Sequence, residues 1–175
     1  MAYNRAKNQD DEVVVMDDRE TTCCFSGHRS LPPETMAFVR QRTERAIRDL
    51  YSQGYKSFIT GGALGYDTMV AVLLFQIRTE IPEIRVVLAY PYEGYNGSWT
   101  LQQWQEYRDR LLRYDEVVCV SEAPSKYAYW ARDRYMVDRS SLCVGFCIDS
   151  ASETGYTMEY ARQKGVCVIN LVENS

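Results

Sequence analysis

The feature that most constrains the fold of this chain is a regular alternation of short apolar runs with longer amphipathic segments. Runs typical of β-strands lie at 21–26, 56–60, 85–89, 116–120, 142–148 and 166–171. Segments with apolar residues at helical spacing lie between them, at 33–53, 67–80, 99–114, 126–139 and 154–164. This order predicts an α/β fold, namely a Rossmann-like, doubly wound, mostly parallel sheet with helices on both faces.

The length of 175 residues suits one domain, and no linker divides the chain. Residues 1–19 are polar and charged, so we expect a flexible N-terminal tail followed by a single domain over 20–175. No run of 18 or more apolar residues is present, which predicts that the protein has no membrane span. The N-terminus has no apolar signal segment, and we therefore expect a cytoplasmic protein.

Charge and cysteine content narrow the functional classes. The formal net charge of −4 does not favour nucleic acid as a partner, because nucleic-acid binders rely on phosphate neutralisation. Six cysteines are present, but Cys143 and Cys147 would lie about 13 Å apart on one strand, too far for a disulfide. No C-x-x-C pair occurs and His28 is the single histidine, so we expect reduced thiols and no metal site.

Polar and glycine-rich segments follow most of the predicted strands. Ser26–Arg29 follows the first strand, Gly61–Gly62 the second and Pro91–Tyr92 the third. The carboxyl ends of parallel strands meet at one edge of a sheet, and ligands of open α/β sheets bind in the crevice there. We therefore expect these segments to line one ligand-binding crevice.

The most specific of these segments is the glycine loop 60–67, with Gly61, Gly62 and Gly65. Glycines permit positive φ and close approach of a ligand to backbone amides, and the following helix presents its positive dipole end to an anion. Asp67 is expected either to cap that helix or to accept a hydrogen bond from a ligand hydroxyl. The pattern is neither G-x-G-x-x-G nor a P-loop, and taken alone it is also compatible with a simple tight turn.

Other residues of the crevice allow two interpretations each. Arg29 can bind a phosphate or be a solvated turn residue, and His28 offers acid–base chemistry without an evident nucleophile. Thr154 and Thr157 can cap the last helix or donate to a phosphate.

The fourth predicted helix carries a further set of polar and aromatic residues. Arg134 stands four residues before Asp138 and can form a helix-surface ion pair. The aromatic residues of that helix, at positions 127, 129, 130 and 135, are interpreted as core and rim packing, with a base-stacking platform as the alternative.

Taken together, these segments resemble a known family. The match is carried by Ser26–Gly27–His28–Arg29, by Thr60–Asp67, by Arg134–Ser140 and by a threonine-bearing turn before Tyr160. In this order they are similar to the YpsA family of the SLOG superfamily, which also contains DprA and the LOG nucleotide hydrolases. The resemblance covers about residues 20–171 and implies a bacterial protein that binds nucleotides or nucleotide-derived signals, with links to cell-division or stress control. The resemblance does not imply a definite enzymatic activity.

Two departures from the family pattern bear on the ligand. Ser152 and Glu153 replace a usual glycine pair before Thr154, and Asp133 stands where an asparagine is usual. Both changes add negative charge beside the expected anion site. Glu153 is positioned either to repel a phosphate or to reach a ribose hydroxyl.

The function expected from the sequence is thus a binding or sensor module for a nucleotide or ADP-ribose-type ligand, with a homo-oligomer compatible with the sequence. One alternative is LOG-like hydrolysis of an N-glycosidic bond, for which Glu159 is out of place. A second alternative is DprA-like handling of single-stranded DNA. The predicted ligand-binding residues are Ser26, Gly27, His28, Arg29, Gly61, Gly62, Gly65, Asp67, Pro91, Tyr92, Arg134, Thr154 and Thr157.

Overall fold

The fold was analysed in a computed structural model, which describes residues 19–172. The tail predicted over 1–19 lies outside the described residues except for Arg19, which opens a 3-10 turn, Arg19–Thr21. The strands are β1 Thr22–Gly27, β2 Ser57–Thr60, β3 Arg85–Tyr90, β4 Glu116–Cys119, β5 Leu142–Phe146 and β6 Cys167–Asn170. The helices are α1 Pro33–Ser52, α2 Tyr66–Ile77, α3 Leu101–Leu111, α4 Ala128–Asp138 and α5 Glu153–Gln163.

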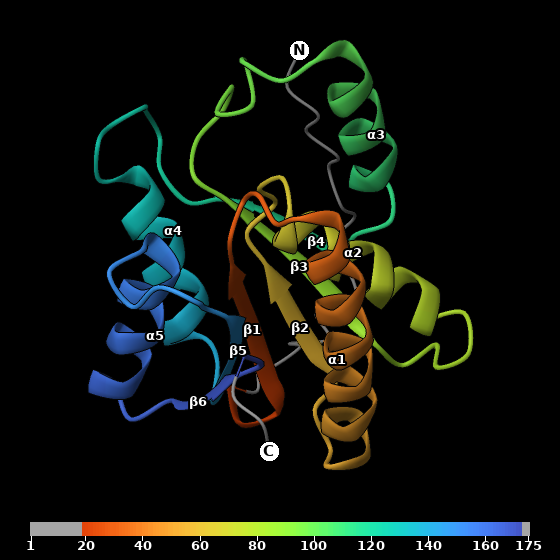
Figure 1. Cartoon of the computed structure of the whole chain (residues 1–175). Helices are drawn as coiled ribbons and strands as arrows, with labels where there is room; N and C mark the ends of the chain where they lie inside the picture. The colour runs from red at the N-terminus through yellow and green to blue at the C-terminus, as the bar shows by residue number, and fades with distance from the viewer. Residues whose placement is uncertain (1–18, 173–175) are drawn as a thin grey trace, which may run out of the picture.

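Every described strand belongs to one parallel sheet with the order β4-β3-β2-β1-β5-β6 (Figure 1). From β1 the chain adds strands outward to β4 on one side, and then crosses over to add β5 and β6 on the other. The predicted doubly wound parallel fold is confirmed. The point where the order reverses lies between β1 and β5, which is where such sheets bind ligands.

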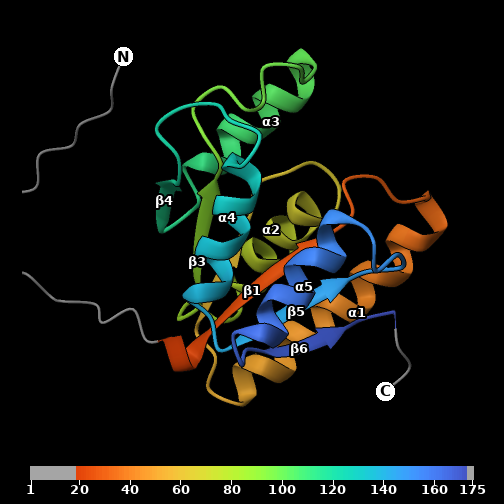
Figure 2. The same ribbon diagram turned by 90° about the vertical axis from the view of Figure 1, so that its left-hand side faces the viewer.

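Helices cover both faces of the sheet. Helices α1 and α2 contact each other on one face, and α4 and α5 contact each other on the opposite face (Figures 1 and 2). Successive residues of β1 point to opposite faces, as the strand period requires. Phe25 packs in the core under α1 and α2 with Phe58 and Leu74, whereas Cys24 packs under α4 and α5 with Met136.

Helix α3 and strand β4 are peripheral to this core. The spacing of Leu101, Trp104, Tyr107 and Leu111 predicts one apolar stripe on α3, but the structure buries Tyr107 alone in that helix. Leu101 is 72% exposed and Trp104 is 42% exposed. The reason is topological, since β4 is the outermost strand on its side and α3 projects beyond the sheet (Figure 1).

The predicted elements all exist, and none of their bounds differs from the predicted one by more than about three residues. The ends of α2 and α3 shift most. Helix α2 stops at Ile77, and the segment up to Pro82 continues in turns, with Glu80 N–H donating to Ile77 O at 2.9 Å. Among the described residues no helix has the length and apolar character needed to cross a membrane.

Candidate ligand pocket at the switch point

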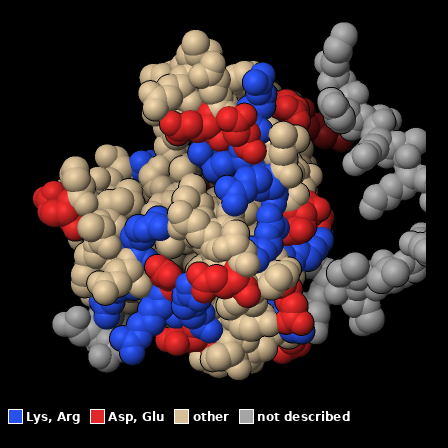
Figure 3. Space-filling model, turned by 90° about the vertical axis from the view of Figure 1, so that its right-hand side faces the viewer, with Lys and Arg blue, Asp and Glu red and all other residues tan. Residues whose placement is uncertain are grey.

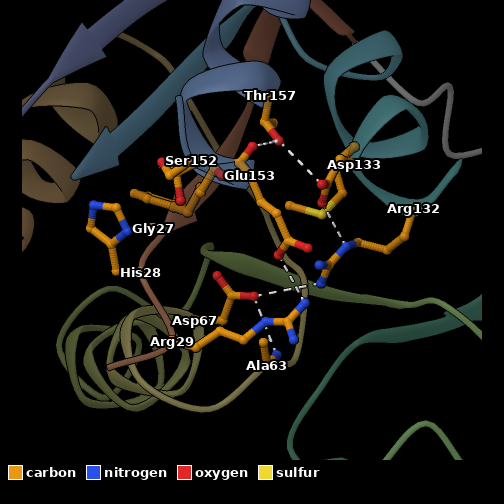
Figure 4. Close-up of a pocket in the computed structure, with 14 residues that line it drawn as sticks. Gly27, His28, Arg29, Ala63, Asp67, Arg132, Asp133, Ser152, Glu153 and Thr157 are labelled. Atoms are coloured by element: carbon orange, nitrogen blue, oxygen red, sulfur yellow. Dashed lines mark hydrogen bonds and ion pairs between the residues drawn. The ribbon is translucent and has the colours of Figure 1, made fainter. Parts of the chain in front are cut away.

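A pocket of about 180 Å³ opens at the carboxyl ends of β1 and β5, the reversal point of the sheet (Figure 4). Four parts of the chain line it: the loop after β1, the glycine loop before α2, one side of α4 and the N-terminus of α5. The principal lining residues are Gly27, His28, Arg29, Ala63, Asp67, Arg132, Asp133, Ser152, Glu153, Thr154 and Thr157.

The glycine loop meets the loop after β1 at very close range. Gly65 has φ of +79°, and a Cβ added there would lie 2.3 Å from the carbonyl oxygen of Arg29. Next to it, the backbone N–H of Tyr66 donates to His28 O at 3.1 Å. Gly65 is therefore required by backbone packing between two loops. Ala63 is the residue by which this loop lines the pocket, whereas the glycines of the loop are not part of the pocket lining.

Asp67 is a buried carboxylate of the first turn of α2, with 6% of its surface exposed. The N-cap of that helix is Gly65, so the expectation that Asp67 caps it is wrong. Its Oδ2 instead accepts from the backbone N–H of Ala63 at 3.2 Å and lies 3.6 Å from Nη1 of Arg132. Burial raises the pKa of Asp67 to about 6, while Arg132 and the Ala63 amide oppose that rise.

Arg132 of α4 is the central cation of the pocket, and the sequence reasoning missed it. It is 6% exposed, and its Nη1 donates to Gly61 O at 2.5 Å. Its Nε lies 2.7 Å from Oδ1 of Asp133. A Cβ on Gly61 would fall 2.0 Å from Arg132 Nη1, so this glycine makes room for the guanidinium. The local sequence gives no signal that distinguishes Arg132 from the exposed arginines near it in the chain.

Asp133 joins α4 to α5. The hydroxyl of Thr157 lies 3.1 Å from Asp133 Oδ2 and 3.0 Å from the carbonyl oxygen of Glu153. Burial raises the pKa of Asp133 above its ordinary value, against the opposing effect of Arg132. Two carboxylates, Asp67 and Asp133, therefore share one buried guanidinium.

An ion pair crosses the mouth of the pocket. Nη2 of Arg29 lies 3.0 Å from Oε2 of Glu153, and these two side chains are 50% and 63% exposed. The guanidinium of Arg29 also lies 4.9 Å from the ring centre of Tyr129, in a cation–π arrangement. Glu153 therefore already pairs with Arg29, the cation that the sequence analysis proposed as a binding group for a ligand phosphate.

The remaining walls are built by His28 and by the start of α5. His28 Nε2 accepts from the backbone N–H of Ile148 at 3.1 Å and ties the loop after β1 to the end of β5. Ser152 is the N-cap of α5, with its Oγ accepting from Gly155 N–H at 3.2 Å. Thr154 is therefore not the cap, and it lies buried in the first turn beside the pocket.

The structure gathers most, but not all, of the residues predicted to bind ligand. Ser26, Gly27, His28, Arg29, Asp67, Thr154 and Thr157 line the pocket. Gly61, Gly62 and Gly65 support it through backbone packing or polar contacts, with Tyr95 Oη donating to Gly62 O at 3.0 Å. Pro91 is buried away from it, and Tyr92 is separated from Arg29 by the ring of Tyr129. Arg134 lies on a neighbouring groove instead.

Comparison with known proteins identifies the family. The YpsA model, described as the YspA SLOG family, matches residues 28–166. This chain belongs to that family. The resemblance seen in the sequence is thereby confirmed. The SPbeta prophage-derived protein YoqJ of Bacillus subtilis is 27% identical over 144 residues, covering 74% of this chain and 83% of YoqJ. A UPF0398 protein of Shouchella clausii is 26% identical over 106 residues, covering 59% of this chain and 56% of that protein.

Two solved structures share the fold. The DNA processing protein A (DprA) of Streptococcus pneumoniae superposes with a TM-score of 0.62 at 16% identity, covering 85% of this chain and 49% of that one. DprA of Helicobacter pylori, described with a single-stranded DNA binding mode, gives a TM-score of 0.59 at 17% identity, covering 91% of this chain and 70% of that one. This chain therefore spans about half the length of some proteins that it matches.

Proposed function

We propose that this protein is a cytoplasmic binding or sensor module whose pocket holds a nucleotide or nucleotide-derived phosphate ligand. The observation that carries the proposal is the position of the pocket. It lies at the reversal point of a parallel sheet, between a guanidinium from the loop after β1 and the N-terminus of α5. Sheets of this type bind ligands at that point, and helix N-termini favour anions.

The charged side chains of the pocket suggest which part of the ligand each of them contacts. Arg29 is half exposed and is paired with an exposed carboxylate, so a phosphate can replace Glu153 at modest cost. Arg132 is buried and its charge is balanced by Asp67 and Asp133, which leaves Arg29 as the cation for the phosphate. The carboxylate of Glu153, once displaced, is an acceptor for ribose hydroxyls. The pocket therefore suits a ribose phosphate better than a polyphosphate chain.

Calorimetric titration with AMP, ADP-ribose, NAD and inorganic pyrophosphate tests the proposal. We expect one site per chain for at least one of the nucleotides, and a loss of affinity in Arg29→Ala. Arg45→Ala is the control, because Arg45 is exposed on α1, away from the pocket, and is also ion-paired on the surface, with Asp49 at 4.0 Å. Absence of binding by every compound, or an equal loss in both variants, would contradict the proposal.

Single-stranded DNA is a second candidate ligand, favoured by the shared fold with DprA proteins. The face that carries α1 and α2 offers no uniform basic surface, because its arginines are interleaved with acidic residues (Figure 3). Arg48 pairs there with Glu44 and Glu80, and Arg78 pairs with Asp115. A fluorescent oligonucleotide titrated at 50 and 200 mM salt separates the candidates, since strand binding weakens steeply with salt.

A further inference from the structure

A second hollow adjoins the pocket. It is a groove of about 460 Å³ between α4 and α5, and it shares Asp133, Glu153 and Thr157 with the pocket. These three residues border both spaces, so the groove lies directly beside the pocket, along the two helices.

The groove is lined by aromatic side chains that stand open to solvent. Trp130 of α4 is 51% exposed, and Tyr156 of α5 is 61% exposed. Tyr160 lies deeper and already carries the guanidinium of Arg134 5.1 Å from its ring centre. Trp130 is therefore not part of the core, and the base-stacking platform that the sequence allowed as the alternative stays open at this residue.

The pocket by itself is too small to enclose a whole nucleotide. Pockets that enclose a whole small ligand measure about 300–1,000 Å³. The pocket falls below that range at about 180 Å³, whereas the groove lies within it. The pocket has the charged groups for a ribose phosphate, and the groove has the aromatic surface that the remaining part of a nucleotide needs.

The charged residues of the groove favour an uncharged ligand group over an anionic one. Its lining has three carboxylates, Asp133, Glu153 and Glu159, against one cation, Arg134. Such a surface repels the phosphates of a nucleic-acid strand and the side chains of an acidic peptide. A nucleobase is flat and uncharged at neutral pH, and it stacks on aromatic side chains whatever its sequence identity.

We infer that the groove between α4 and α5 is a base-stacking subsite, in which Trp130 and Tyr156 hold the nucleobase of the ligand whose ribose phosphate lies in the pocket. This inference rests on the proposed function and names the part of the ligand that the pocket does not enclose. If Trp130 and Tyr156 hold the base, they are the residues that make the protein bind nucleotides more tightly than sugar phosphates.

The test compares AMP, GMP, CMP and UMP with ribose 5-phosphate by calorimetric titration. Loss of one stacking contact costs about five- to 150-fold in affinity. We expect the nucleotides to bind more tightly than ribose 5-phosphate by a factor in that range. Trp130→Ala and Tyr156→Ala should lower nucleotide affinity toward that of ribose 5-phosphate and leave ribose 5-phosphate binding unchanged. Trp130→Phe, which keeps a ring, should retain most of the nucleotide affinity.

Trp104→Ala is the matched control, since Trp104 is 42% exposed on α3 with an arginine stacked on it, and it lies away from the groove. Equal affinity of nucleotides and ribose 5-phosphate would overturn the base subsite and leave the proposed function standing. Binding of neither would overturn both. A change from dimer to monomer in Trp130→Ala, seen by sedimentation, would show instead that the groove is an interface between copies of this chain and would overturn the inference.

Discussion

At the residue scale, the pocket is governed by carboxylates that the fold holds close to two arginines. Asp67 and Asp133 flank Arg132 below the surface, and Glu153 reaches Arg29 at the mouth. An acidic site of this kind binds an anion only when a carboxylate is protonated, moved or used as an acceptor by another part of the ligand. The carboxylates therefore decide which ligands are accepted, and two of them can be tested singly.

The buried carboxylate of Asp67 should make stability depend on pH. Its pKa is raised in the folded protein from 3.8 to about 6, so the proton is bound more tightly when the chain is folded. The stability that this gives is fully present below about pH 4 and is lost as pH rises through about 6. We expect the wild type to lose stability relative to Asp67→Asn between pH 4 and pH 7, measured by urea unfolding at half-unit steps.

Asp49→Asn serves as the control, because Asp49 is exposed on α1 with a long 4.0 Å contact to Arg45. Its stability curve should run parallel to that of the wild type. A parallel curve for Asp67→Asn as well would show that the Asp67 carboxylate is not stabilised in its protonated form.

Glu153 should act as a competitor for Arg29. Glu153→Gln removes one negative charge and releases the guanidinium, so we expect inorganic pyrophosphate to bind about two- to fivefold more tightly, the scale of an exposed ion pair. Glu80→Gln is closely matched, since Glu80 is 62% exposed and pairs with Arg48 at 2.9 Å. Titration calorimetry at low salt gives both constants. Equal affinities in the two variants would mean that Glu153 does not compete with the anion.

At the scale of the elements, the pocket depends on how two loops are packed. The loop after β1 and the glycine loop touch through Gly65, and α5 begins at a cap formed by Ser152. These features set where the pocket walls stand. They explain why glycine is present at a position that contributes no atom to the pocket lining.

Gly65→Ala should therefore destabilise the fold strongly, for two reasons that act together. Gly65 has φ of +79° and ψ of −121°, outside the left-handed helical conformation in which a Cβ costs about 1–2 kcal/mol, and its Cβ would also strike Arg29 O. Gly165→Ala gives the cost of a positive φ in open space, because Gly165 has φ of +71° and an added Cβ there meets nothing within 4 Å. Denaturant unfolding should show a clearly larger loss for Gly65→Ala. Similar losses would rule out the close approach as the reason for this glycine.

Helix caps show what the sequence could and could not predict. The order of strands and helices followed from local periodicity, which each segment carries in itself. The cap at Ser152 was not assigned, since a threonine two residues later also suits that position. Arg132 was missed because burial of a helix arginine depends on what the opposite helix and loop present to it. The exposure of Leu101 followed from the outer position of β4, which no local pattern encodes.

At the scale of the whole molecule, the pocket joins two halves of the sheet. One half is β1 to β4, and the other is β5 and β6 with the helix α5 that connects them. The direct links across the open end include the His28 contact to Ile148 and the ion pair between Arg29 and Glu153. A ligand bound there would add contacts to both halves at once. It should also stabilise the folded state by about 2.7 kcal/mol at a hundred times its dissociation constant.

Hydrogen exchange should show this coupling directly. With a saturating nucleotide selected by the titrations, we expect slower exchange in residues 27–32 after β1 and in residues 149–157 at the start of α5, because both segments border the pocket. Helix α3 provides an internal control, since it projects from the sheet and contributes nothing to the pocket lining. Protection confined to one of the two segments would indicate binding beside the switch point. Equal protection of α3 would indicate a general effect of ligand on stability, and the site would then have to be sought elsewhere.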